Sequence, residues 1–196
     1  MRLSIFLVFV CLAIALCSCQ SIKIRTGPPT DDEATVQSAD RGSQVRSEWA
    51  DRLRRATLPQ QATLLKGFVD STCARYIRFG YQIADTWRDE SDRRGTEIPV
   101  ADIRQMIDAS TRTDLPLFEA YEDVLEYGID GIREARFFQP RTEDLLIEYR
   151  DHYLEIYSAV FYPNGSQEEF ESRLRMLRTR SEDLSLKLEE ELQRYR

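Results

Sequence analysis

Apolar residues recur at intervals of three and four from Gln44 to the C-terminus, which is the period of an amphipathic α-helix. Strand-like alternation of apolar and polar residues is absent from this part of the sequence. The periodic segments are separated by proline, glycine and threonine, which start or end helices. The predicted helices span about 44–56, 57–92, 97–109, 114–136, 141–161 and 166–196. We therefore predict an all-α fold, a helical bundle of five to six helices with a long amphipathic C-terminal helix.

The helix predicted at 57–92 carries the longest apolar stripe and is expected to form the centre of the core. The stripe consists of Leu65, Val69, Cys73, Tyr76, Gly80, Ile83 and Trp87. Cys73 is the only cysteine after residue 19, so this part of the chain can form no intramolecular disulfide. A lone cysteine on an apolar stripe is typical of a buried small residue, and we expect Cys73 to be buried.

The helix predicted at 166–196 begins with a capping box, Ser166 and Glu169, and continues with the 3–4 spacing of a coiled-coil seam in which Ser181 fills one position. It would span about 45 Å, against about 20 and 35 Å for the helices at 97–109 and 114–136. We therefore predict that it extends past the bundle from about residue 184 onward. The possible docking or self-association surface consists of Leu184, Leu188 and Leu192. A terminal helix packed along its whole length is the alternative.

The start of the chain is a single charge, Arg2, followed by an almost unbroken apolar run from Leu3 to Leu16. This run is shorter than the roughly 20 residues that a membrane-spanning helix needs, and it is typical of a secretory signal peptide. The segment that closes it, Leu16-Cys17-Ser18-Cys19, resembles the lipobox of bacterial lipoproteins. The resemblance implies that residues 1–18 are removed and that Cys19 becomes a lipidated first residue carrying a diacylglyceryl group and a further acyl chain, typically palmitate. An ordinary cleaved signal peptide is the alternative.

The residue after the cysteine, Gln20, bears on location. In lipoproteins of bacteria with two membranes, an aspartate at this position favours retention in the inner membrane. The resemblance therefore implies a protein on the periplasmic face of the outer membrane. In a host with one membrane, it implies the outer face of the plasma membrane.

The part after residue 19 has 26 basic and 34 acidic side chains, a net charge of −8. This balance argues against nucleic acid as a partner and against electrostatic binding to anionic lipid. Residues 19–43 are largely polar without sustained periodicity, and we expect a lipidated N-terminus and a flexible tether there. Residues 44–196 are expected to form one helical domain.

Candidate catalytic chemistry is sparse. Glu148, His152 and Glu155 fall on one helical face, and a second acidic row, Glu119, Asp123 and Glu126, could face them in a carboxylate-rich metal site. Such rows are more often solvated, and the chain has one histidine, where di-iron bundles use one from each of two helices. We therefore assign no catalytic residue, metal or cofactor.

The sequence favours a lipid-anchored cell-envelope protein whose helical domain binds another envelope protein or its own copies, as a scaffold, pilot or assembly factor does. A bundle that binds a small apolar or aromatic molecule is the first alternative, because tyrosine, phenylalanine and tryptophan are frequent along the helices. A metal-dependent enzyme with a carboxylate-rich site is the second.

Overall fold

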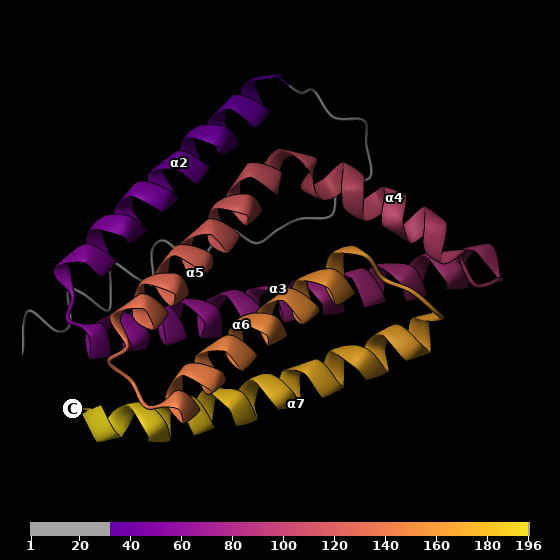
Figure 1. Cartoon of the computed structure of the whole chain (residues 1–196). Coiled ribbons are helices and arrows are strands. Elements are labelled where there is room, and N and C mark those ends of the chain that lie inside the picture. Colours follow the sequence, from indigo (N-terminus) through magenta and orange to yellow (C-terminus); the bar gives the residue numbers. More distant parts are fainter. Residues whose placement is uncertain (1–31, 196) are drawn as a thin grey trace, which may run out of the picture.

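The computed structural model describes residues 32–195, and in this range it consists of helices with no β-strand (Figure 1). The predicted signal peptide and Cys19 lie outside the described residues. None of the described helices is long and apolar enough to cross a bilayer. The α-helices are α2 (Asp32–Arg55), α3 (Leu58–Arg94), α4 (Val100–Thr111), α5 (Leu115–Ala135), α6 (Pro140–Phe161) and α7 (Gln167–Leu192). Short 3₁₀ turns follow α4 (η1, Arg112–Asp114) and α7 (η2, Gln193–Tyr195). The predicted all-α bundle with six helices and a long C-terminal helix is confirmed.

The longest helix, α3, runs along α5, α6 and α7, and the bundle is arranged around it (Figure 1). Its 37 residues correspond to about 55 Å. α7 lies antiparallel to α3, since Lys66 near the start of α3 contacts Ser185 near the end of α7, and Arg88 contacts Glu171 at the opposite end. α2 lies against α5 on the other side of the molecule.

The first helix begins earlier than predicted. Residues 32–43 belong to α2, so the predicted tether of residues 19–43 is wrong for this part. Gly42 is buried against α5, where a Cβ atom would lie 2.6 Å from the carbonyl oxygen of Pro116. Arg46 then forms an ion pair with Asp123 on α5. The prediction failed because a glycine that allows close helix contact leaves a gap in the apolar pattern.

The other helix boundaries agree with the prediction to within about four residues, and the starts of α3 and α7 carry capping boxes. The backbone N–H of Thr57 donates to the side chain of Gln60 at the start of α3. At the start of α7 the capping box is complete: Ser166 N–H donates to the Glu169 carboxylate, and Glu169 N–H donates to Ser166 Oγ.

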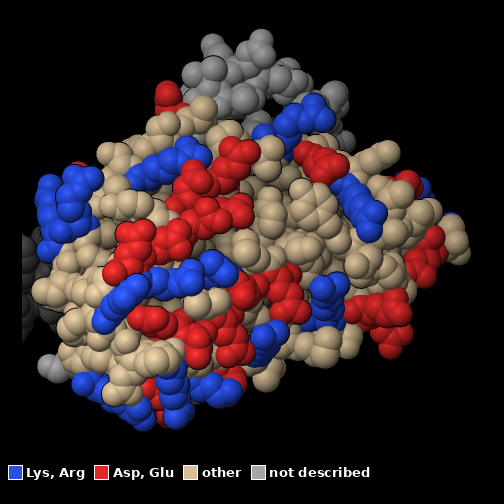
Figure 2. Space-filling view, in the orientation of Figure 1, with Lys and Arg blue, Asp and Glu red and all other residues tan. Residues whose placement is uncertain are grey.

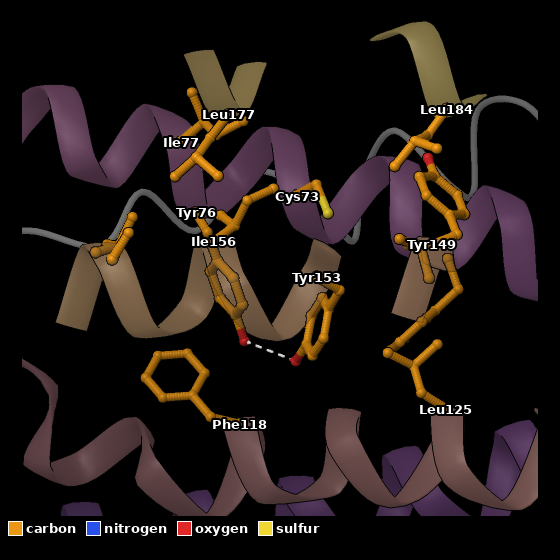
Figure 3. Packing of buried hydrophobic residues seen from close by; sticks show 14 of the residues in the cluster. Cys73, Tyr76, Ile77, Phe118, Leu125, Tyr149, Tyr153, Ile156, Leu177 and Leu184 are labelled. Atoms are coloured by element: carbon orange, nitrogen blue, oxygen red, sulfur yellow. Dashed lines mark hydrogen bonds between the residues drawn. The ribbon is translucent and has the colours of Figure 1, made fainter. Parts of the chain in front are cut away.

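Aromatic side chains fill the middle of the core, between α3, α5 and α6 (Figure 3). The ring of Tyr76 contacts those of Phe118 and Phe161, with centroids 5.6 and 5.3 Å apart. Its hydroxyl lies 3.3 Å from that of Tyr153, so each polar tip has a partner inside the core. These aromatic residues therefore pack against one another.

The C-terminal half of α7 does not extend past the bundle. Leu184, Leu188 and Leu192 are each at most 2% exposed, so the prediction that they form a docking surface is wrong. The prediction compared the length of α7 with the lengths of two short helices. In the structure α7 packs along α3, which is longer than α7. After α7, the hydroxyl of Tyr195 accepts the backbone N–H of Gln139 and fixes the end of the chain against α6.

We expect Gly80→Ala to destabilise the fold and Gly67→Ala to stabilise it. A Cβ atom at Gly80 would lie 2.7 Å from Leu174, a fully buried side chain, so the substitution should cost roughly 1–3 kcal/mol of unfolding free energy. Gly67 is the matched control on the same helix: a Cβ there meets nothing within 4 Å, and alanine should add about 0.5–1 kcal/mol through helix propensity. Urea unfolding measures both. Equal effects of the two substitutions would contradict the close contact at Gly80.

Candidate functional site

A cleft of about 720 Å³ lies between α3 and α7, with Tyr149 of α6 at its base. Its lining follows one face of each helix at helical spacing, so the cleft runs along the helix axes. The lining residues are Asp70, Cys73, Ala74, Ile77, Arg78 and Tyr81 on α3 and Arg178, Ser181, Glu182, Ser185 and Leu186 on α7.

The cleft exists because small side chains replace larger ones where α3 and α7 meet. Leu177 and Leu184 of α7 are buried in the core, but Ser181 and Ser185 between and beside them are small. Ala74, also small, belongs to the lining on α3 and is exposed. The interruption of the leucine spacing at Ser181 is visible in the sequence, but its place in one lining with Ala74 depends on the packing of two helices separated by more than seventy residues.

Polar contacts tie the three helices together at the base of the cleft. Lys66 Nζ donates to Asp70 Oδ2 at 2.8 Å and to Ser185 Oγ at 2.9 Å. The hydroxyl of Tyr149 donates to the other oxygen of Asp70. Burial, and then the hydrogen bond to Asp70, raise the pKa of Tyr149, so it remains a donor at neutral pH. Sequence analysis missed this group, and its only local signal was the i,i+4 spacing of Lys66 and Asp70.

Cys73 lies beside this group and is 1% exposed, which confirms the predicted burial. Loss of hydration, and then the negative charge of Asp70, raise the pKa of the Cys73 thiol to about 12. The reactive thiolate is therefore scarce at neutral pH, and Cys73 acts as a small core residue.

The single histidine forms a second contact between α6 and α7. His152 is buried, and its Nε2 lies 3.1 Å from the carbonyl oxygen of Leu177 and 2.9 Å from Ser181 Oγ. Because a carbonyl can only accept, Nε2 carries the proton and donates to it. Burial lowers the pKa of His152, so the ring is neutral at neutral pH.

Ser181, His152 and Glu155 lie in series, as in a serine hydrolase, but the geometry does not suit that chemistry. Proton abstraction from Ser181 needs a free lone pair on Nε2, which is protonated and hydrogen-bonded to Leu177. On the other side, Nδ1 lies 3.5 Å from Glu155, too far for a good hydrogen bond. His152 is therefore a structural link between two helices.

The two acidic rows do not form a metal site. Arg180 bridges Glu148 at 3.4 Å and Glu155 at 2.9 Å, which neutralises the carboxylates nearest to His152. On α5, Asp123 is paired with Arg46. Acidic side chains gather over α5 and α6 as a surface band (Figure 2). In residues 32–195 no group of three or more His, Cys, Asp or Glu side chains is arranged to hold a metal ion.

A smaller hollow of about 200 Å³ lies between η1, the start of α5 and the end of α6. Aromatic side chains line part of it, namely Phe118, Tyr157, Phe161 and Tyr162. This volume is below the roughly 300–1,000 Å³ of typical ligand sites, so the cleft between α3 and α7 is the better candidate.

The rim of the cleft carries an exposed apolar side chain and a free charge. Leu186 is 66% exposed and belongs to the lining, which also includes the apolar Ile77 and Ala74. Arg78 has no ion-pair partner among the described residues, whereas Arg178 on the opposite rim is paired with Glu182 at 3.1 Å. Exposed apolar side chains beside a hollow are typical of interaction surfaces.

Comparisons of the chain with protein-family models, curated proteins and solved structures found no match.

We expect His152 to make the domain less stable as the pH falls from 7 to 5. Its pKa in the folded state is below the ordinary value of about 6.5, so the unfolded chain takes up the proton first. The free energy of unfolding therefore begins to decrease as the pH falls through about 6.5, and the decrease stops below the folded-state pKa of His152. Chemical unfolding at several pH values measures it. His152→Gln is the control, since the amide can still donate to Leu177 but does not titrate. Parallel losses in both proteins would contradict the prediction.

Proposed function

We propose that the protein is a lipid-anchored component of the cell envelope whose helical domain binds a protein at the cleft between α3 and α7. The observation that carries the proposal is Leu186, a largely exposed leucine on the rim of an open cleft that follows two antiparallel helices. Burying this side chain against a partner would contribute about 1.5–3 kcal/mol.

The anchor is assigned on sequence alone. An apolar run of signal-peptide length ends at Leu16-Cys17-Ser18-Cys19, which resembles a lipobox, and Cys19 is the proposed site of lipidation. Two or three acyl chains hold a protein at a membrane, whereas one binds only marginally. With Gln20 after the cysteine, the proposed location is the periplasmic face of the outer membrane.

The shape and chemistry of the cleft favour a protein segment over a small apolar molecule. The lining from Asp70 to Tyr81 covers about 16 Å of helix, enough for two to three turns of a partner helix lying in the groove. Small-molecule sites enclose most of their ligand and are mainly apolar, but this cleft is open and its lining includes charged residues of both signs. The aromatic side chains that could have lined an enclosed site fill the core instead.

We expect Cys19→Ala to abolish acylation and to leave an uncleaved precursor. In the lipoprotein class the lipid is attached to this thiol before the signal peptide is cleaved. Metabolic labelling with a fatty-acid analogue, followed by gel mobility, measures both effects. Cys17→Ala is the matched control and should be labelled normally, because the position two before the cysteine accepts small residues. Undiminished label on Cys19→Ala would contradict the assignment.

A photo-crosslinking amino acid at position 186 should give a specific protein adduct in intact cells. The same amino acid at position 176 should not, although Met176 is 64% exposed on the same helix, because Met176 lies outside the cleft. The crosslinked protein is identified by mass spectrometry, and its purified form should bind the wild-type chain and bind Leu186→Arg more weakly. Equal crosslinking at both positions, or none at either, would contradict the proposed binding surface.

A further inference from the structure

We propose that Asn164 is a site of spontaneous deamidation, at which the folded chain converts a side-chain amide to a carboxylate and gains a negative charge at the start of α7. Asn164 is the only asparagine in the sequence, and a glycine follows it. Both residues are exposed in the short connection between α6 and α7. The site is separate from the cleft between α3 and α7 and from the proposed anchor.

The reaction joins the backbone nitrogen of Gly165 to the side-chain carbonyl carbon of Asn164. The nitrogen attacks Cγ, its proton leaves with the amide nitrogen as ammonia, and a succinimide ring forms. Water then opens the ring. Attack of water at Cγ gives aspartate, and attack at the backbone carbonyl carbon gives isoaspartate, in which the main chain runs through the former side chain. The sum is one water consumed and one ammonia released, with no oxidant or reductant.

The attacking nitrogen, that of Gly165, is unhindered. Gly165 has a φ of 79°, and a Cβ atom there would collide with the Glu169 carboxylate, so glycine is required and no side chain shields the nitrogen. No residue in the described part of the chain accepts a hydrogen bond from the Gly165 N–H. The next N–H, that of Ser166, donates to Glu169 at 2.8 Å. The nitrogen that must react is therefore the one that no hydrogen bond holds.

A positive charge lies next to the carbonyl group that is attacked. Nη1 of Arg173 is 3.5 Å from Oδ1 of Asn164, and Arg173 has no carboxylate partner among residues 32–195. The attack places negative charge on Oδ1, and a positive charge held beside that oxygen stabilises the intermediate. Both side chains line a hollow of about 540 Å³ at the surface, where the water that opens the ring has access.

The aspartate product suits the same surroundings. Its carboxylate lies just ahead of Ser166, the N-cap residue of α7, where the partial positive charge of the helix N-terminus favours an anion. It also gives Arg173 the ion-pair partner that this guanidinium lacks. We therefore expect aspartate at position 164 to leave the fold intact.

The isoaspartate product alters the connection between the two helices. The chain is held on both sides of Asn164, because Nε of Arg104 donates to the carbonyl oxygen of Pro163 at 2.8 Å and Ser166 caps α7. Isoaspartate inserts an extra main-chain carbon between these two points. Either the contact of Arg104 or the cap of α7 must then shift, and loss of a cap destabilises the domain.

The test is a time course of the purified full-length chain at neutral pH and growth temperature. Its peptides are separated by chromatography and weighed by mass spectrometry. The peptide with Asn164 should gain the mass difference between an amide and a carboxylic acid, in two forms that elute separately. Asn164→Gln should show no such change, because its longer side chain would have to close a larger ring. Asn164→Asp identifies the aspartate form and should unfold at the same urea concentration as the wild-type chain.

A second comparison tests the role of Arg173. Arg173→Gln should slow the conversion about two- to fivefold, the effect of one exposed charged contact. Arg175→Gln is the matched control and should react at the wild-type rate, because Arg175 is exposed on the same helix but contacts Glu171. Equal rates for Arg173→Gln and the wild-type chain would overturn this role.

The unfolded chain supplies the decisive control. In urea the Asn164-Gly165 pair is free of the turn and should convert with the same two products. A folded chain that keeps its amide over the time in which the unfolded chain converts would show that the turn prevents the attack, and would overturn Asn164 as a modification site of the folded protein.

Discussion

The packing of α7 along α3 is the constraint on which the rest of the structure depends. α3 contacts α5, α6 and α7, and the chain returns along it in α7 after more than seventy residues. This return requires close approach at Gly80, where leucine and valine side chains from α7 and α6 meet the backbone of α3. The aromatic core between α3, α5 and α6 is closed by this contact. The cleft is the place where the same contact is left incomplete.

Small polar residues at the base of that cleft leave space at the surface and also form hydrogen bonds between helices. Serines at 181 and 185 bury less apolar surface than leucines would, but Ser185 accepts a hydrogen bond from Lys66, and Ser181 Oγ lies 2.9 Å from Nε2 of His152. Each serine is therefore a second polar partner, because Lys66 also donates to Asp70 and Nε2 of His152 also contacts the Leu177 carbonyl oxygen. The interface between α3 and α7 is thus held by specific polar contacts at its base and left open at its rim.

Local signals allowed most of the fold to be predicted, whereas the site depends on contacts between distant segments. Capping residues and apolar periodicity located five of the six helices, and the stripe through Cys73 identified its buried face. The start of α2 was missed because a glycine such as Gly42 usually indicates a helix end. Its role became clear only from the structure, where the backbone of α5 lies against it. Leu184 and its neighbours were misplaced because helix length was compared without knowing that α3 is the packing partner. The cleft is formed by α3 and α7 together, and the sequence indicated it only through the irregular leucine spacing at Ser181.

The early start of α2 also changes the distance at which the proposed anchor holds the domain. Asp32 is thirteen positions after Cys19, and a chain of that length spans at most about 45 Å, less than the length of α3. A domain held this close to a bilayer meets mainly other proteins confined to the same surface. Confinement raises the effective concentration of anchored neighbours, as a short linker does for joined domains. If the proposed anchor is present, it removes much of the translational freedom that binding in solution would cost, and a modest surface around one exposed leucine would then suffice for the proposed association.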